Sequence, residues 1–423
     1  MSITDGSTAG LATSGDAQVF RTLEGQRGLP RWFPIVYRVI AGLKQGAIEW
    51  RLPDGRVFRA QGIAPGPEAR IVVRDPRMFG RIVRGGNLGF CEAYLDGWFE
   101  VEPDLQNLLD LLLLNNEEVL HSLPGGPAAQ ILNRLRHWLN RNSRSGSKRN
   151  IAAHYDLSNA FYEKWLDPSM TYSSALFERE DMSLQEAQRA KYRSICDRME
   201  LRQGDHVLEI GCGWGGFAEY AARERGARVT GLTLSKEQLD FAQARMQREG
   251  LSEKVDLHLR DYRDENGRYD GVASIEMFEA VGEKYWPSYF NTVRDRLTEG
   301  GRASLQIITI EDRLFEDYRR GVDFIQKYIF PGGMLPSVGA LKRQTKAAGL
   351  EWVGRLDFGE SYSRTLREWR VRFLSAWDEI EGLVGARPFD AEFKRLWDLY
   401  LTSCAACFLA GTTNVTQIAL RRG

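Results

Sequence analysis

The sequence predicts an α/β protein in which a doubly wound parallel sheet is preceded by a smaller α+β domain and followed by a helical addition. The 423 residues are long enough for two domains. From residue 151 onward, short apolar runs alternate with helical patterns, the arrangement of a parallel sheet covered by helices. Within this region the apolar run Val207–Ile210 leads into a glycine-rich turn, Gly211–Gly216, and then into an amphipathic helix.

The first domain is expected to cover residues 1–126. Alternating apolar and polar residues on either side of Pro53–Gly55 predict a hairpin, and apolar residues at helical spacing predict helices. The expected elements are a helix at Leu29–Leu43, the hairpin at Gly46–Arg59, a strand at Arg70–Val73, and helices at Pro76–Arg84 and Leu105–Leu120. Nothing here reads as a catalytic cluster, so two interpretations stay open: a dimerisation or scaffolding domain, and a lipid-facing domain.

Residues 127–150 are expected to form a basic amphipathic linker. Its apolar residues fall on one helical face: Ile131, Leu132, Leu135, Trp138 and Leu139. Six Lys or Arg residues and no acidic residue follow from Arg134 to Arg149. Such a helix suits an anionic membrane surface, and it equally suits packing on its own protein with a solvated basic side.

Residues 151–423 are expected to form the catalytic domain. Ser183 and Glu186 have the spacing of a capping box, which predicts a helix running to about Glu200. The strands expected are His206–Ile210, Ala227–Leu234, Val255–Arg260, Tyr269–Met277, Ala303–Ile310 and a last one at Asn414–Leu420. Further helices are expected from Ser235 to Gly250 and at Glu283–Leu297, Ser337–Ala348, Thr365–Gly382 and Phe389–Ala410.

The composition limits the classes of function. Lys and Arg together number 57, as do Asp and Glu, and this balance argues against a general nucleic-acid-binding protein. The chain has five cysteines, a sparse and odd set that is typical of proteins in a reducing compartment. No metal site is expected from the sequence. The polar N-terminus has no signal-peptide pattern, and the longest apolar block, Leu111–Leu114 with Leu108 and Leu109, is far too short to span a bilayer. We therefore expect a cytoplasmic protein, peripheral on the inner face of the membrane.

The glycine turn indicates a nucleotide-type cofactor. Alternating glycines let the backbone take a positive φ and approach a ligand closely, and the helix that follows presents free N–H groups to it. An acid, Glu209, precedes the glycines, and Asp261 and Tyr262 follow the third strand, where ligands of such sheets sit. The second strand lacks a ribose-binding acid at its end. Gln238 can replace that acid, or it can simply complete a helix cap.

The spacing E-x-G-x-G-x-G resembles that of S-adenosylmethionine (SAM) methyltransferases, and longer stretches make the resemblance specific. These are His154–Phe177, Glu209–Gly216, Gly231–Gln238, Asp261–Asp264, Met277–Gly282 and Lys327–Ser337, with Gly85–Phe99 in the first domain. They resemble the cyclopropane-fatty-acyl-phospholipid synthase family, which is related to the mycolic acid cyclopropane synthases. The resemblance covers nearly the whole chain. It implies a class I SAM-methyltransferase fold, which is Rossmann-like, and it suggests a homodimer.

The resemblance also implies a reaction. The double bond of a cis-unsaturated acyl chain in a membrane phospholipid attacks the SAM methyl group, and a base, bicarbonate in the family, removes a proton so that a cyclopropane ring closes. An alkene is a poor nucleophile, so positioning and a dry pocket must supply much of the rate, and aromatic faces must shield the cation. The aromatic candidates are Tyr155, Phe161, Tyr162, Trp165, Tyr172, Phe278, Tyr328 and Phe330.

By the same resemblance, two groups of residues form the site. The SAM-binding group is Tyr172, Ser173, Gly211, Gly213, Thr233, Leu234, Gln238, Tyr262 and Ile275, to which the sequence pattern adds Glu209 and Asp261. The catalytic group, which would hold bicarbonate, is Ser174, Glu279, Gln306, Ile308 and Tyr362. Glu279 corresponds to the family's catalytic acid, and it can hold the anion's hydroxyl or relay a proton.

Two positions in the catalytic group depart from the family. Ser174 stands where the family usually has Cys, and Gln306 where the phospholipid enzymes have His; Gln306 cannot carry charge. If the cation lost a different proton, the product would be a methyl- or methylene-branched chain. Two further alternatives are a catalytically inactive lipid-binding protein and a methyltransferase for a soluble small molecule.

Overall fold

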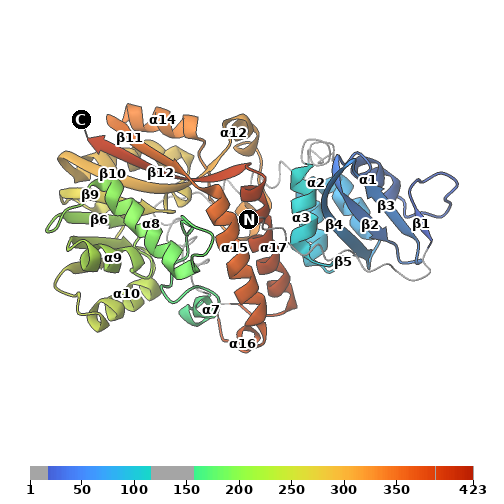
Figure 1. The fold of residues 1–423 in the computed structure, drawn as a ribbon, viewed down its shortest axis with the longest axis horizontal. Coiled ribbons are helices and arrows are strands. Elements are labelled where there is room, and N and C mark those ends of the chain that lie inside the picture. Colours follow the sequence, from blue (N-terminus) through green and yellow to red (C-terminus); the bar gives the residue numbers. More distant parts are fainter. Residues whose placement is uncertain (1–17, 116–156, 386, 423) are drawn as a thin grey trace. The chain divides into compact units, whose positions relative to one another are not determined.

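A computed structural model describes residues 18–115, 157–385 and 387–422 of the chain (Figure 1). The linker expected at residues 127–150 lies outside the described residues, as does Tyr155. The described residues divide into two compact units. One unit contains residues 18–115 together with 391–410, and the other contains the rest of the described residues.

The first unit contains a five-stranded sheet in the order β1-β3-β2-β4-β5. Its strands are β1 (Val19–Phe20), β2 (Gln45–Arg51), β3 (Val57–Gln61), β4 (Ala64–Val73) and β5 (Phe99–Glu102). Its helices are α1 (Phe33–Ile40), α2 (Arg77–Leu95), α3 (Leu105–Leu114) and α17 (Ala391–Leu409). β2 and β3 pair antiparallel as the predicted hairpin. The ring of Phe33 lies 5.1 Å from the rings of Phe58 and Phe79, so α1 and α2 pack on one core with the sheet.

Two features of this unit differ from the sequence prediction. α2 continues past Arg84 through a kink at Gly86 (φ 56°, ψ −138°) and ends only at Leu95. Gly86 can take this backbone without a side-chain clash, so the helix bends there and does not stop. The helix predicted at Phe389–Ala410 forms as α17 but belongs to the first unit, where the Tyr94 hydroxyl donates to Asp398 Oδ2 at 3.3 Å. An apolar helical pattern indicates a buried helix without indicating which core buries it.

The second unit is built on a seven-stranded sheet in the order β11-β12-β10-β9-β6-β7-β8. Its strands are β6 (His206–Ile210), β7 (Arg228–Thr233), β8 (Val255–Leu259), β9 (Tyr269–Ile275), β10 (Leu297–Ile310), β11 (Leu350–Asp357) and β12 (Thr413–Arg422). β6 to β10 are parallel, and β12 inserts antiparallel between β10 and β11. The predicted doubly wound sheet is therefore confirmed. β11 was not predicted, because the strand is half-exposed and its alternation is short.

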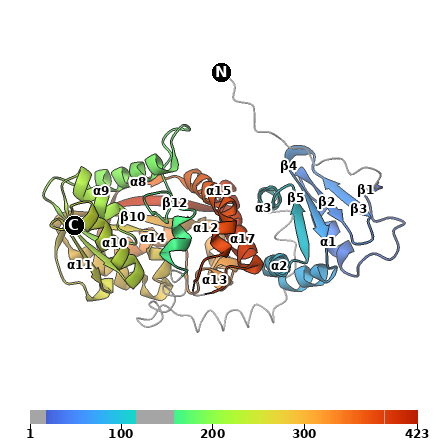
Figure 2. The ribbon, with the colours of Figure 1, turned by 90° about the horizontal axis from the view of Figure 1, so that it is seen from below.

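Helices cover both faces of this sheet. The helices of the unit are α7 (Asn159–Glu163), α8 (Leu184–Met199), α9 (Gly216–Glu224), α10 (Lys236–Arg248), α11 (Trp286–Arg296), α12 (Asp312–Tyr318), α13 (Phe324–Tyr328), α14 (Val338–Ala347), α15 (Gly359–Ser375) and α16 (Trp377–Glu381). α8, α9 and α10 share one hydrophobic cluster with the strands, and α11 and α14 share a second. Figure 2 shows α8 and α9 on the opposite side of the sheet from α11. This arrangement leaves the carboxyl ends of β6, β7 and β9 at one edge of the sheet, where the site lies.

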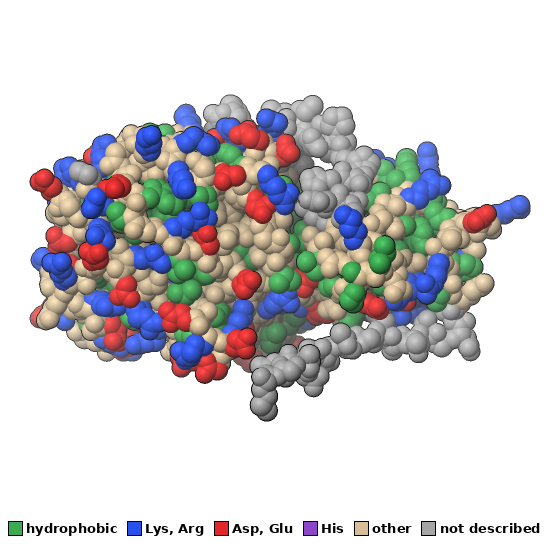
Figure 3. Space-filling model, turned by 45° about the horizontal axis from the view of Figure 1, so that its top comes forward, with side chains coloured by type: hydrophobic (Ala, Val, Ile, Leu, Met, Phe, Trp, Pro, Cys, Tyr) green, Lys and Arg blue, Asp and Glu red, His purple; other side chains and the backbone are tan. Residues whose placement is uncertain are grey.

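The surface carries mixed charge. On the face drawn in Figure 3, Lys and Arg side chains are interspersed with Asp and Glu side chains, and this face has no extended region of one sign. Within the described ranges, every helix is too short or too polar to cross a bilayer.

Candidate active site

The glycine turn after β6 has the backbone that its sequence predicts. Gly211, Gly213 and Gly215 have φ values of 88°, 50° and 83°, which L side chains rarely adopt. A Cβ atom on Gly211 would lie 2.9 Å from Met277 Cγ, so this position also requires the absence of a side chain. Gly215 caps α9, whose first N–H groups therefore face the turn.

A cavity of about 170 Å³ lies beside this turn. All of the residues that the sequence analysis assigns to the cofactor line it: Tyr172, Ser173, Glu209, Gly211, Gly213, Thr233, Leu234, Gln238, Asp261, Tyr262 and Ile275. Several further lining residues have no individual role assigned from the sequence, among them Trp214, Arg263 and Glu276. The structure thus brings together residues from four strand ends and from the segment before α8.

Glu209 has the environment expected of a ligand for a cation or a hydroxyl group. It is 3% exposed, and its Oε2 atom is buried without a hydrogen-bond partner among the described residues. Burial raises the pKa of Glu209 to about 8, against the opposing effect of the positive charges on Lys191 and Arg245. An unpartnered buried carboxyl oxygen facing a cavity fits a cofactor with a cationic group and hydroxyl donors.

Gln238 and Asp261 are both held in place by neighbours. Gln238 Oε1 accepts from the Thr233 hydroxyl at 3.0 Å, while the Ser235 hydroxyl caps α10 by accepting from the Gln238 backbone N–H. The predicted reciprocal capping box is not formed here, so the Gln238 side chain lies at the cavity and does not cap the helix. The Asp261 carboxylate pairs with Arg263 at 2.5 Å.

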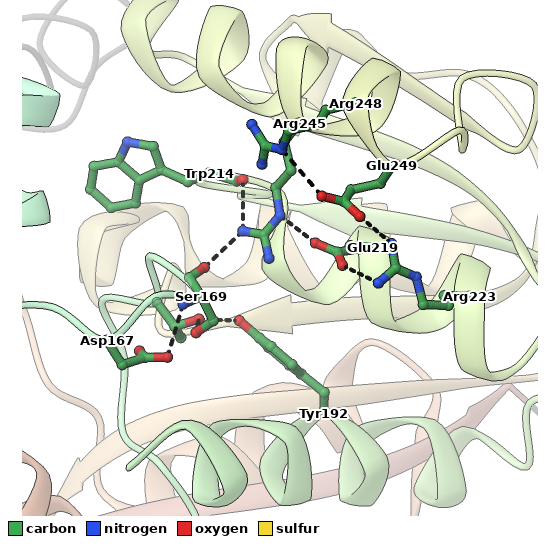
Figure 4. A network of polar contacts seen from close by, with 10 residues as sticks. Asp167, Ser169, Tyr192, Trp214, Glu219, Arg223, Arg245, Arg248 and Glu249 are labelled. Carbon is green, nitrogen blue, oxygen red and sulfur yellow. Dashed lines mark hydrogen bonds and ion pairs between the residues drawn. The ribbon is translucent and has the colours of Figure 1, made fainter.

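Arg245, on α10, ties the glycine turn to the segment before α8 (Figure 4). Its Nη1 donates to the Ser169 carbonyl at 2.7 Å and to the Trp214 carbonyl at 3.4 Å, and its Nε donates to Glu219. Glu219 in turn pairs with Arg223 at 3.0 Å. The guanidinium is largely buried, so these charge-assisted bonds fix the two loops that form opposite walls of the cavity.

An aromatic cluster lies beside the cavity and reaches it through Tyr172. The ring of Tyr172 lies 5.4 Å from those of Tyr162 and Trp369 and 5.5 Å from that of Trp165. Trp369 was not predicted, because α15 lies almost 200 residues after the other members of the cluster. Phe278 instead stacks on Trp286 and Tyr289 in the core beside α11. Its role is packing, and it does not join this cluster.

The five residues predicted for catalysis also come together. The Ser174 N–H and the Gln306 amide both donate to Glu276, and Tyr362 hydrogen-bonds to the same carboxylate. The Ile308 N–H donates to Glu279 Oε1. The segment at Ser174, the end of β9, the middle of β10 and the start of α15 therefore meet at a pair of carboxyl groups.

Glu279 and Glu276 differ in surroundings. Burial and the nearby Glu276 charge raise the pKa of Glu279 to about 8, and its Oε2 atom is buried without a partner among the described residues. Loss of hydration also raises the pKa of Glu276, but several hydrogen bonds and the Lys191 charge oppose this. Glu276 lies in the segment after β9 where the sequence places site residues, but the sequence does not indicate its role. It shares with Glu279 the pattern of an acid after an apolar strand, and its partner Gln306 is 30 residues away.

Lys191 is a second residue of the site that no sequence pattern indicates. It lies on α8, is fully buried, and donates from Nζ to the Ser173 hydroxyl at 2.6 Å. Desolvation lowers the pKa of Lys191, and the charges of Glu276, Asp167 and Glu209 oppose that shift. The site therefore has its own buried cation next to its acids.

Comparison with known proteins agrees with this site. The family model described as mycolic acid cyclopropane synthetase matches residues 142–418. The chain is 37% identical over 379 residues to the tuberculostearic acid methyltransferase of Mycobacterium tuberculosis, covering 85% of this chain and 84% of that protein. It is 36% identical over 373 residues to the cyclopropane-fatty-acyl-phospholipid synthase of Escherichia coli, covering 86% of this chain and 89% of that protein.

A solved structure is also similar. It is a mycolic acid cyclopropane synthase in complex with SAH and CTAB, with a TM-score of 0.61 and 31% identity, covering 65% of this chain and 98% of that one. The methyl donor of this fold is SAM, for which the cavity beside the glycine turn has fitting residues. The chain therefore belongs to the mycolic acid cyclopropane synthetase family, and it is a SAM-dependent C-methyltransferase with the class I methyltransferase fold.

Proposed function

We propose that this enzyme adds one carbon from SAM across the cis double bond of an unsaturated acyl chain in a membrane phospholipid, giving a cyclopropane fatty acyl chain. The observation that carries the proposal is the meeting of three features at one cavity: the glycine turn, the Tyr172 ring with its aromatic cluster, and the buried carboxyl groups of Glu209 and Glu276. The name of the Escherichia coli relative supports the substrate.

The residues of the chain have separate tasks in this proposal. SAM supplies an electrophilic methyl group when it is bound, and the eleven lining residues predicted from the sequence would hold it. The Tyr172 ring lines the cavity, where it would stabilise a developing cation and exclude water, and Trp369 packs against this ring. The two carboxyl groups, Glu276 and Glu279, are positioned to accept and relay the proton that leaves the product.

A second candidate product has its own support. If the proton leaves the acyl chain and not the new methyl group, the product is a methyl-branched chain with a double bond. If a hydride first shifts to the cationic carbon and the new methyl group then loses the proton, the product is a methylene-branched chain. Both products have the same gain of one CH₂. The neutral Gln306 in the acid pocket favours this candidate, as does the similarity to a tuberculostearic acid methyltransferase.

Lipid analysis tests both candidates. The protein is expressed in a host that is rich in monounsaturated phospholipids and lacks such an enzyme, and its fatty acids are analysed by mass spectrometry and proton NMR. We expect chains heavier by one CH₂, with ring protons for a cyclopropane and olefinic protons for a methylene branch. An unaltered lipid profile from folded, SAM-binding protein contradicts the proposal.

We also propose that the enzyme works at the membrane surface, with the basic segment at residues 127–150 attracting anionic lipid and the first unit contributing to lipid contact or to a homodimer. Replacing Arg134, Arg136 and Arg141 with Gln should weaken binding to anionic vesicles by about 1 kcal/mol for each charge and lower activity on them. Sedimentation with anionic and neutral vesicles measures this. A soluble substrate predicts that the activity of this variant is unchanged.

A further inference from the structure

The carboxylate of Glu276 is held in the middle of the pocket that the sequence analysis assigns to an external anion. The Ser174 N–H donates to Glu276 Oε1 at 2.9 Å and the Gln306 amide donates to the same atom at 2.8 Å. Tyr362, from α15, adds a further hydrogen bond to this carboxylate. Glu276 also lines the cofactor cavity, so its carboxylate lies between the two parts of the site.

A chain of hydrogen bonds fixes the direction of the Gln306 amide. The Ser194 hydroxyl and Arg198 Nε donate to Gln417 Oε1, at 2.6 and 3.2 Å. Gln417 Nε2 then donates to Gln306 Oε1 at 3.0 Å. Because the oxygen of Gln306 is occupied in this way, its NH₂ group must face Glu276. Two buried amides on β10 and β12 are thus arranged to present a donor to an anion that belongs to the protein.

The charge of Glu276 is balanced within the protein. Lys191 is fully buried on α8, and its Nζ is fixed 2.6 Å from the hydroxyl of Ser173, the neighbour of Ser174. A buried ammonium group requires a compensating negative charge. Among the charges that act on Lys191, that of Glu276 has the largest effect.

The backbone at Glu276 also indicates a functional role. Its φ is 50°, a left-handed conformation that residues other than glycine rarely adopt. Such conformations persist where surrounding contacts hold them, and they are concentrated at active sites. Here the conformation turns the side chain from the end of β9 toward Ser174 and Gln306.

We infer that the Glu276 carboxylate is the catalytic base, and that it takes the place of an external bicarbonate. The inference rests on the proposed function. The double bond supplies the electron pair of the new bond to the methyl carbon, and the sulfur–carbon bond of SAM breaks with its electrons remaining on sulfur. For ring closure, a C–H bond of the new methyl group then breaks, its electron pair forms the bond from the methyl carbon to the cationic carbon, and the proton passes to Glu276.

Bicarbonate does not fit this arrangement. Three donors of the predicted anion pocket, from Ser174, Gln306 and Tyr362, are already bonded to Glu276. A second anion in contact with this carboxylate would be repelled strongly in a site shielded from water. The protein thus holds in a side chain the charge that a bound anion would otherwise supply.

Bicarbonate dependence of the unmodified enzyme is the first test. Turnover is measured with unsaturated phospholipid vesicles in buffer freed of CO₂ and again with added bicarbonate, and binding of ¹³C-bicarbonate to the SAH-bound enzyme is followed by NMR. We expect equal turnover in both buffers and no bound signal. Turnover that requires bicarbonate, or a bound ¹³C signal, overturns the inference.

Two variants sharpen the test. Glu276→Gly accepts the positive φ and empties the pocket, so it should bind ¹³C-bicarbonate, lose about 10²–10⁴-fold in turnover without it, and recover activity when it is added. Glu276→Gln keeps the shape but cannot take a proton, so it should lose the same activity and not recover. Near-normal turnover of the Gln variant contradicts the inference.

The binding measurement needs no lipid substrate. If no lipid product forms under any condition, the proposed substrate fails, while bicarbonate binding to the Gly variant but not to the unmodified enzyme still supports the role of Glu276 as the resident anion. Binding to the unmodified enzyme refutes that role, whether or not the Gly variant folds.

Discussion

Three carboxyl groups lie in or beside the cavity, and each has different neighbours. Glu209 has an unpartnered buried oxygen near Lys191 and Arg245, Glu276 accepts several hydrogen bonds, and Glu279 accepts one backbone hydrogen bond close to Glu276. Environments that differ in this way separate the protonation states of like groups. We assign Glu209 to the cofactor, Glu276 to proton abstraction, and Glu279, whose pKa burial raises to about 8, to a supporting or relay role.

SAM affinity should rise with pH because of Glu209. Its pKa of about 8 means that it is mostly protonated at pH 6.5 and ionised at pH 9, and only the ionised form attracts the SAM cation. Calorimetric titration between these pH values should show an increase of about tenfold in affinity. Glu209→Gln should remove most of this dependence.

Other charges near Glu209 set the size of this effect. Lys191 on α8 loses its proton more readily than a free lysine because burial lowers its pKa. The loss of this positive charge also raises the affinity for the SAM cation as the pH rises, as ionisation of Glu209 does. Arg245 on α10 keeps its charge throughout, and Glu276 after β9 adds negative charge. An equal pH slope in the unmodified enzyme and in Glu209→Gln contradicts the assignment of Glu209 to the cofactor.

Glu279→Gln should affect chemistry and not cofactor binding. The Ile308 N–H that donates to Glu279 can still donate to the amide oxygen, but the proton relay is lost, so turnover should fall about 10²–10⁴-fold. The SAM dissociation constant should change by less than about twofold. Glu283→Gln, at an exposed position of the next turn, is the matched control and should retain full turnover. A collapse of SAM binding would make Glu279 a cofactor or structural residue.

At the scale of elements, the strand–turn–helix unit around the glycines is the part that local sequence determines most completely. Apolar Val207–Ile210 formed β6, the glycines took positive φ, and Ser183 and Glu186 formed the predicted capping box of α8. Each of these depends on residues within a few positions of one another. The Gln306–Glu276 contact depends on β10 lying beside β9, and the Tyr172–Trp369 contact depends on α15 lying beside the segment before α8. Local patterns do not encode either arrangement.

Gly211→Ala tests this element. In this variant the added Cβ atom would lie 2.9 Å from Met277 Cγ, and the alanine would have to adopt a φ of 88°. Met277 directly follows Glu276, whose φ is also positive. The backbone cost of about 1–2 kcal/mol should appear as lower stability, and the shift of Met277 should weaken SAM binding about tenfold or more. Thermal unfolding and calorimetric titration measure the two effects separately.

Gly204→Ala is the matched control. Gly204 has nearly the same φ, 87°, but nothing within 4 Å of the added Cβ atom, and it lies in the turn before β6. It should lose a similar amount of stability and bind SAM normally. If both variants bind SAM equally, the turn at Gly211 does not shape the cofactor site.

At the scale of the whole molecule, the first unit is assembled from distant parts of the chain. α17 is separated from α3 by almost all of the second unit in sequence, yet the contacts group it with α2 and α3. The sequence predicted both the helix and the α+β domain, and it placed the helix in the wrong unit because helical periodicity does not name a partner. The catalytic sheet similarly receives the antiparallel strand between β10 and β11 from residues 413–422, far along the sequence from β6.

Leu399→Ala tests whether α17 belongs to the first unit. Leu399 is fully buried, so the cavity should cost about 2–5 kcal/mol of stability. Hydrogen exchange should increase in α2 and α3, while β6 and β7 remain protected. Leu409→Ala, at a 46% exposed position of the same helix, is the matched control and should change stability by less than about 1 kcal/mol. Increased exchange confined to the second unit contradicts the grouping.

The late position of α17 and β12 has a consequence for biosynthesis. At a translation rate of about 5–20 residues per second, α3 is made about 15–55 s before α17, and for that time the surface of α2 and α3 lacks its covering helix. The sheet lacks β12 until residues 413–422 have been made, so Gln417 cannot orient Gln306 on a shorter nascent chain. Such a chain lacks the arrangement that holds Glu276. The site that we propose for chemistry on the membrane therefore assembles only after β12 has been translated.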